Sequence, residues 1–278
     1  MKSSTMFALF GVVGGWIALT DIVGAQEPAL VPPALESSKL QQSLDAAEMD
    51  GKFTFIVFVR EDSAAAREML KIAKTGAARR EAQAVVTTAR ANDPAEKALI
   101  ERFGIGRAPM PVTVAVAPNG AITGVFAKTL SDEHMDAAIV TPTMMTCMKS
   151  LQNKKLVFVL VAASDKAEMP AGVKSLQSDP LFKDRMTFAS MRVDDPAETR
   201  FISQMKIDPL RVEGPYAVLI APPGVLVGHF DSTATGAQIA AAIHKSGQCC
   251  DDPNCKHGAA PAPAPAQQAT NPNSSRKN

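Results

Sequence analysis

The chain has 278 residues, of which 46% are hydrophobic and 21% are charged. These fractions are ordinary for a globular protein, and the length allows one large domain or two small ones. The 29 basic and 28 acidic residues nearly cancel, so bulk charge does not draw this protein to nucleic acid. We therefore expect no nucleic-acid partner.

The N-terminus has the pattern of an export signal. Lys2 precedes an uncharged apolar run over 6–19, and Val23 and Ala25 are the small residues expected before a cleavage site. The run is shorter than the roughly 20 apolar residues of a membrane span. We predict a signal peptide over 1–25 and no transmembrane segment after its removal, with an uncleaved anchor as the alternative. The mature protein should then be exported, either periplasmic or extracellular.

Two segments are too rich in proline or polar residues to form a core. A linker over 26–39 contains three prolines, and a tail over 258–278 contains alternating alanine and proline followed by polar residues. Such segments cannot bury enough apolar surface to offset the entropy of ordering them. We expect the tail to be disordered and the folded protein to lie between these segments.

The chain repeats itself at a spacing of 102 to 104 residues. The sequence Asp-Pro-Ala-Glu stands at 93–96 and again at 195–198, and an apolar run that opens at Pro111 recurs at Pro215. Five such matches occur in the same order at a nearly constant offset, which is difficult to explain by chance. The self-similarity indicates two copies of one structural unit.

The hydrophobic pattern of the first copy predicts alternating strands and helices. Its first and third strands are nearly unbroken apolar runs, which is typical of strands covered on both faces. Pro-Asn-Gly at 118–120 is a hairpin turn signal before the last strand. The predicted fold class is α/β, with two tandem domains over 40–150 and 151–248, each a central mixed sheet flanked by helices. The predicted strands cover 53–59, 84–90, 112–117 and 121–127, and the helices lie near 63–75, 94–103 and 131–150.

This order resembles the thioredoxin fold, over about residues 40–150 and again over 151–250. The landmarks are an apolar strand followed directly by a helix, a proline that opens the third strand, and a glycine-containing hairpin. In that family the proline is cis and faces an active-site dithiol. The resemblance therefore implies cis bonds at Met110-Pro111 and Gly214-Pro215, with Pro109 as a competing candidate in the first copy.

The dithiol of the family is missing from both copies. Its Cys-x-x-Cys motif sits at the start of the helix after the first strand, and alignment places Ser63 and Ala66 at those two positions. The matching segment of the second copy, 163–168, contains no cysteine either. A CxxC thiol-disulfide oxidoreductase is thus excluded at these positions. We interpret Asp62-Ser63 and Ser164-Asp165 as helix N-caps, because no base is apparent that would activate a serine nucleophile.

Three of the four cysteines lie in a short segment over 249–257, between the last predicted helix and the tail. One interpretation is a structural disulfide that joins Cys255 to either Cys249 or Cys250. A second is a zinc or copper(I) site that also uses His257, although the spacing fits no standard zinc pattern. A third is a redox-active thiol pair on a flexible end. On balance we expect no cofactor.

The fourth cysteine, Cys147, lies at the end of the last helix predicted for the first copy. The repeat offset matches it to position 251, so a disulfide to Cys249 or Cys250 would tie the two copies together. The alternative is a small buried hydrophobic residue. The surrounding Met-Met-Thr-Cys-Met over 144–148 invites a copper(I) interpretation. Neighbouring methionines on a helix point in different directions, however, and we expect ordinary packing.

Together these patterns favour an exported, non-catalytic thioredoxin-like protein that binds or organises a protein or peptide partner. Where such domains lack their cysteines, the surface around the cis proline can still hold an extended peptide by main-chain pairing. The candidate peptide-binding residues are Met110, Pro111, Gly214 and Pro215. The alternative is a thiol-redox or metal-handling protein that acts through the C-terminal cysteines and His257. A structural envelope component is a third hypothesis.

Overall fold

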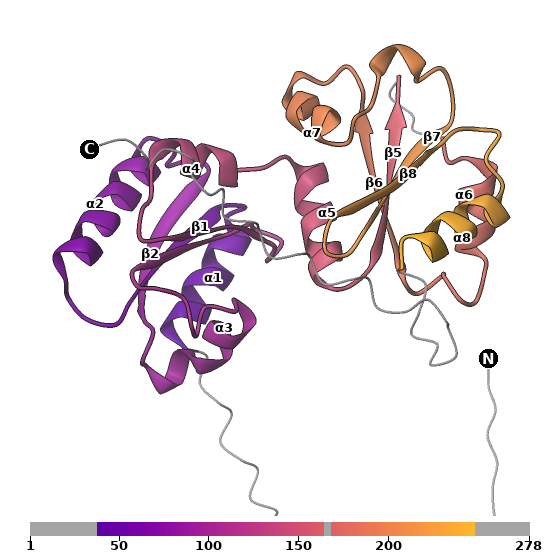
Figure 1. Ribbon diagram of the computed structural model, residues 1–278. Helices are drawn as coiled ribbons and strands as arrows, with labels where there is room; N and C mark the ends of the chain where they lie inside the picture. The colour runs from indigo at the N-terminus through magenta and orange to yellow at the C-terminus, as the bar shows by residue number, and fades with distance from the viewer. Residues whose placement is uncertain (1–37, 164–167, 248–278) are drawn as a thin grey trace, which may run out of the picture. The chain divides into compact units, whose positions relative to one another are not determined.

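The computed structural model describes residues 38–163 and 168–247, which form two similar repeats (Figure 1). The first repeat consists of α1 (Lys39–Met49), β1 (Phe53–Val59), α2 (Ala64–Ala78), β2 (Ala84–Arg90), the short 3-10 helix η1 (Pro94–Glu96), α3 (Lys97–Arg102), β3 (Val112–Val116), β4 (Ile122–Ala127) and α4 (Asp132–Ala138). The second consists of α5 (Pro142–Gln152), β5 (Leu156–Ala162), α6 (Ala171–Gln177), β6 (Met186–Arg192), η2 (Pro196–Glu198), α7 (Thr199–Gln204), η3 (Pro209–Arg211), β7 (Tyr216–Ala221), β8 (Val225–Phe230) and α8 (Gly236–Lys245).

Each repeat contains one four-stranded mixed sheet. The strand orders are β2-β1-β3-β4 and β6-β5-β7-β8, and in both sheets the first pair is parallel while the other two pairs are antiparallel. Helices lie on both faces of each sheet (Figure 1). This architecture confirms the predicted α/β class with two tandem thioredoxin-like domains, and the four predicted strands of the first copy match to within one residue at each end.

The central strand β1 is buried on both faces. Its side chains alternate, so Phe53, Phe55 and Val57 join the core beneath α2 and α4, whereas Ile56 and Phe58 join the core beneath α1 and α3. The last four of these residues are fully buried. The unbroken apolar run that predicted this strand is therefore a consequence of having helices on both sides.

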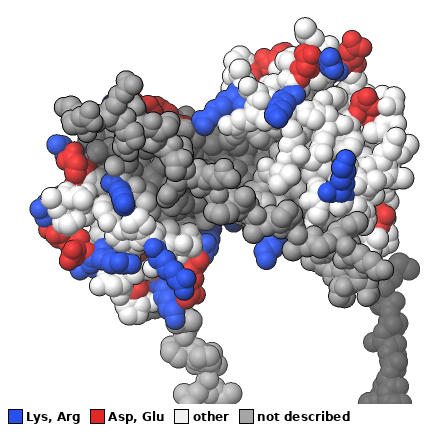
Figure 2. All heavy atoms as spheres, in the orientation of Figure 1, with Lys and Arg blue, Asp and Glu red and all other residues white. Residues whose placement is uncertain are grey.

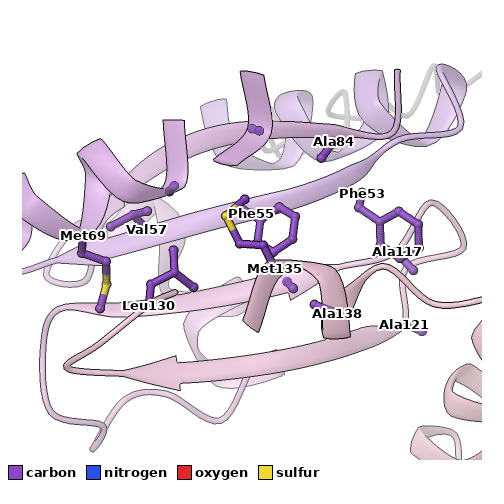
Figure 3. Close-up of a cluster of buried hydrophobic side chains, with 13 residues drawn as sticks. Phe53, Phe55, Val57, Met69, Ala84, Ala117, Ala121, Leu130, Met135 and Ala138 are labelled. Carbon is purple, nitrogen blue, oxygen red and sulfur yellow. The ribbon is translucent and has the colours of Figure 1, made fainter. Parts of the chain in front are cut away.

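The core between the sheet and the helices α2 and α4 is closely packed (Figure 3). Met69 of α2 and Met135 of α4 lie against Phe55 and Leu130 in this cluster. A Cβ atom at Gly76 would overlap with the Sδ atom of Met135. A side chain at position 76 would therefore force the buried side chain of Met135 to move.

The helix predicted over 131–150 is two helices, so that prediction was wrong. Helix α4 ends at Ala138, and α5 begins at Pro142 after Thr141, whose extended backbone has ψ of 159°. A residue before proline is disfavoured in the helical conformation, which accounts for the break. The new helix packs against β5 and β6 and occupies the place in the second repeat that α1 has in the first.

The duplicated Asp-Pro-Ala-Glu motif holds the first helix of each repeat. Its glutamates are almost fully buried, with Glu96 6% and Glu198 4% exposed. The carboxylate of Glu96 accepts hydrogen bonds from Ser38 Oγ at 2.7 Å and from the Leu40 backbone N–H at 3.3 Å, and Glu198 accepts one from Thr141 Oγ1 at 2.9 Å. Ser38 and Thr141 are the N-caps of α1 and α5. We call this contact the glutamate clamp.

A second polar contact joins α2 to α4. The guanidinium of Arg80, whose side chain is only 11% exposed, donates to Asp132 Oδ1 at 2.8 Å and also pairs with Asp136. These hydrogen bonds raise the pKa of Arg80, and the bond from Arg80 lowers the pKa of Asp132. The two helices that cover one face of the first sheet are therefore held together at their surface by charge.

Within residues 38–163 and 168–247, no helix has both the length and the apolar character needed to cross a membrane. On the face shown in Figure 2, basic and acidic side chains are intermixed.

We predict that Glu96→Ala lowers the free energy of unfolding by about 2–3 kcal/mol, because it leaves Ser38 and Leu40 without their buried charged acceptor. Urea denaturation followed by circular dichroism measures the change. Glu101→Ala is the control, since this side chain is 68% exposed and its loss should cost less than about 0.5 kcal/mol. Equal losses in the two variants would contradict the clamp.

We predict that Arg80→Met lowers the melting temperature at pH 7 and that this deficit shrinks in acid. The folded-state pKa of Asp132 is depressed, so the stabilisation is complete above the ordinary aspartate pKa of about 3.9 and is lost as the pH falls through the folded-state value. Thermal melts of both proteins between pH 7 and pH 2.5 measure this trend. Arg79→Met is the control, because Arg79 is 59% exposed and also pairs with Asp132, so its effect should be smaller. A deficit that is independent of pH would contradict the assignment.

Candidate functional site

The pairing of β1 with β3 brings two segments that are distant in sequence to one end of the first sheet. Phe58 is paired with Val112, so the residues that follow Phe58 lie beside those that precede Val112. A cavity of about 180 Å³ forms where these segments meet the start of α2. It contains the predicted peptide-binding residues Met110 and Pro111, together with Ser63 and Ala66, which align with the missing dithiol. Its lining is Val59, Arg60, Glu61, Ser63, Ala66, Met110 and Pro111.

The Met110–Pro111 peptide bond is cis, which confirms the prediction and excludes Pro109 from this role. Pro111 is buried, and its carbonyl accepts a hydrogen bond from the Lys128 N–H at 3.0 Å. Met110 is half-buried, and its side chain packs against the core beneath α1 and α3. In the part of the chain that the structure describes, neither the N–H nor the C=O of Met110 has a backbone partner. This residue therefore presents an unpaired main-chain donor and acceptor beside the cavity.

Ser63 is the N-cap of α2, as predicted. Its Oγ accepts a hydrogen bond from the Ala66 N–H at 3.2 Å, which satisfies one of the free donors of the first turn. The neighbouring Asp62 pairs with Arg67 at 2.8 Å, and both of these side chains are exposed. No histidine or cysteine occurs among the described residues that line the cavity. The described lining thus offers Ser63 no imidazole base.

A larger cavity of about 560 Å³ adjoins the first and shares Val59, Glu61 and Ala66 with it. It extends between the first turns of α1 and α2 to Thr88 and Arg90 of β2, which is an edge strand of the sheet. Sequence analysis missed the part that Arg60, Glu61 and Arg90 have in lining these cavities. The available signal was the charge at the ends of two strands: Arg60 and Glu61 directly follow β1, and Arg90 is the last residue of β2.

The second repeat does not reproduce this site. The Gly214–Pro215 peptide bond is not cis, so that prediction was wrong. The connection from α7 to β7 is two residues longer than its counterpart in the first repeat and contains η3, so the chain approaches β7 differently. The proposed N-cap at Ser164-Asp165 lies outside the described residues, and α6 begins at Ala171 after Pro170.

Cys147 is a buried residue of α5, with 2% of its surface exposed. Because α5 corresponds to α1, Cys147 occupies the position of Leu44 rather than one matching residue 251, so the predicted correspondence was wrong. Leu44 is also buried. Burial raises the pKa of the Cys147 thiol to about 12, with a smaller contribution from the negative charge of Glu198. At neutral pH the thiol is therefore protonated.

The C-terminal cluster of Cys249, Cys250, Cys255 and His257 lies outside the described residues, as do the predicted signal peptide and tail. Its possible disulfides, thiol chemistry and zinc or copper binding stay predictions. Within the described ranges, no group of three or more histidine, cysteine, aspartate or glutamate residues is placed to hold a metal ion.

No protein-family model matches the sequence, and the comparison with curated proteins finds no match. Among solved structures, the NTD_N/C domain of alkylhydroperoxide reductase AhpF from Enterococcus faecalis is 14% identical with a TM-score of 0.28, over 72% of this chain and 95% of that domain. Zinc-bound human ERp44 is 9% identical with a TM-score of 0.31, over 75% of this chain and 59% of its own. The first two thioredoxin domains of Naumovozyma dairenensis Eps1p are 12% identical with a TM-score of 0.26, over 71% and 92%. These scores are too low to carry an argument, so the fold assignment rests on strand order and helix placement.

We predict that Ser63→Ala lowers the free energy of unfolding by about 1 kcal/mol, because the Ala66 N–H loses its cap, and that Ser63→Asp restores most of this loss. Chemical denaturation measures both changes. Ser43→Ala is the control: Ser43 lies within α1 and donates to the Lys39 carbonyl, so its loss should change stability by less than about 0.5 kcal/mol. A neutral Ser63→Ala variant would contradict the capping role.

Proposed function

We propose that this thioredoxin-like protein is non-catalytic and binds an extended peptide or protein segment in the cavity beside Met110. The observation that carries the proposal is the unpaired N–H and C=O of Met110, which border the cavity at the end of β1. An extended peptide pairs with exposed main-chain groups of this kind as an added strand does. The export predicted for residues 1–25 belongs to the proposal and would place the partner outside the cytoplasm.

The residues that line the cavity support peptide binding rather than catalysis. Ser63 and Ala66 stand where the resemblance places two reactive thiols, and the oxygen of Ser63 is engaged in capping α2. Arg60 and Glu61 provide charges of both signs in the lining, and the half-buried Met110 adds an adaptable apolar contact. Main-chain pairing gives affinity in such a site, and the side chains around it give selectivity.

The test uses fluorescein-labelled peptides of about ten residues with alternating apolar and polar side chains and no proline, titrated with the full chain and followed by anisotropy. We expect Met110→Asp to weaken binding by about tenfold or more, because it places a carboxylate where apolar contact is needed, in a cavity that Glu61 also lines. Gly214→Asp is the matched control in the second repeat, where an added Cβ would meet no atom within 4 Å, and it should bind like the unmodified protein.

A second set of peptides distinguishes strand-like main-chain pairing from nonspecific binding. N-methylation removes one main-chain donor at a time, and in a paired strand only alternate residues face the partner strand. Binding should therefore fall for one alternate set of methylated positions and persist for the other. Uniform sensitivity along the peptide, or equal affinity of the Met110→Asp and unmodified proteins, would overturn the proposal.

A further inference from the structure

A cavity of about 340 Å³ whose lining is rich in sulfur is formed mainly by the second repeat, and Thr123, Ala137 and Val140 of the first repeat complete its lining. Three of its sulfur atoms come from one helix, α5, and the fourth comes from the residue that follows α7. The remaining lining contributed by the second repeat is largely apolar and includes Phe201, Ile220 and Leu226. The four sulfur-bearing residues, which we call the sulfur cluster, are Met144, Cys147, Met148 and Met205.

The helical periodicity explains why three residues of the 144–148 segment line the same cavity although the segment as a whole does not. Met144, Cys147 and Met148 are spaced at i, i+3 and i+4, which places them on one face of α5. Met145 is not part of the cavity lining. Cys147 and Met205 are 2% and 3% exposed, whereas Met144 and Met148 are half-buried. The cluster therefore combines a buried thiol and a buried thioether with two thioethers that lie closer to the surface.

The first repeat shows that this fold does not need sulfur at these positions. Helix α1 matches α5, and its residues at the three matching positions are Gln41, Leu44 and Asp45. The residue that matches Met205 is Phe103, which is also buried. Two repeats with the same backbone arrangement thus differ by four sulfur atoms that line one cavity.

We propose that the sulfur cluster is a binding site for a copper(I) ion. Thioether and thiolate sulfur atoms are soft ligands, and they select copper(I) over hard cations that prefer oxygen. When the ion binds, its bond to Cys147 Sγ replaces the S–H bond and the proton passes to water, without electron transfer. The three thioethers are neutral ligands, so the ion and its four ligands together carry no net charge. Arg200 also lines the cavity, but it is exposed to solvent. This function is separate from peptide binding in the first repeat.

The test is a titration of the reduced full chain with copper(I) under nitrogen, in competition with bicinchoninate. The chain carries Cys249→Ser, Cys250→Ser and Cys255→Ser, so the C-terminal thiols cannot supply the ligands. We expect one copper(I) ion per chain, and X-ray absorption should show sulfur as the dominant neighbour. Cys147→Ala in the same background should weaken binding by about tenfold or more.

Thioether binding is tested by replacing Met144, Met148 and Met205 together with leucine, which nearly conserves volume and should leave the fold intact by circular dichroism. We expect this variant to bind copper(I) about tenfold more weakly. The matched control replaces Met69 and Met135 of the first repeat with leucine and should bind like the parent. Absence of stoichiometric copper in the parent, or unchanged affinity in the leucine variant of the cluster, would overturn the proposal.

Discussion

A strand that is apolar on both faces cannot fold unless helices cover both faces, and this constraint organises each repeat. β1 and β5 are such strands, with almost every side chain buried. The helices that cover them are short, between 6 and 15 residues, so their own hydrogen bonds do not suffice to hold them in place. The glutamate clamp fixes the first helix on one face of each sheet. In the first repeat, Arg80 fixes the pair of helices on the opposite face.

The location of the candidate site follows from the same arrangement. The buried pairing of β1 with β3 ends where helix α2 must begin, so the start of that helix, the end of β1 and the segment before β3 meet at one edge of the core. In the first repeat this junction leaves the main chain of Met110 unpaired beside a cavity. In the second repeat the longer connection from α7 to β7 changes the junction. Sulfur-bearing side chains of α5 and of the residue after α7 line a different cavity there. The two repeats have thus kept one backbone plan and placed their distinctive side chains at different sites.

Local patterns were sufficient to predict the strands, the hairpin and the N-cap at Ser63, because each depends on residues that are adjacent in sequence. The break before Pro142 was also present in the sequence, but the apolar periodicity across 131–150 obscured it. The conformation at Pro215 depends on how a connection of different length approaches β7, which no local pattern encodes. The Asp-Pro-Ala-Glu motif was visible as a repeat, but its partner residues lie 57 and 58 positions away.

The glutamate clamp also bears on the order in which the chain assembles. Each clamp closes a loop of nearly sixty residues that contains two helices and two strands, so it forms only after these elements have been brought together. Both partners of each clamp belong to the same repeat. The first repeat can therefore close its loop during synthesis before α5 has been made, and the second can close without reference to the first. The chain contains two repeats, but the sequence separation of this contact is nearly the same in both. For this contact, folding therefore requires residues no more distant in sequence than a single repeat would.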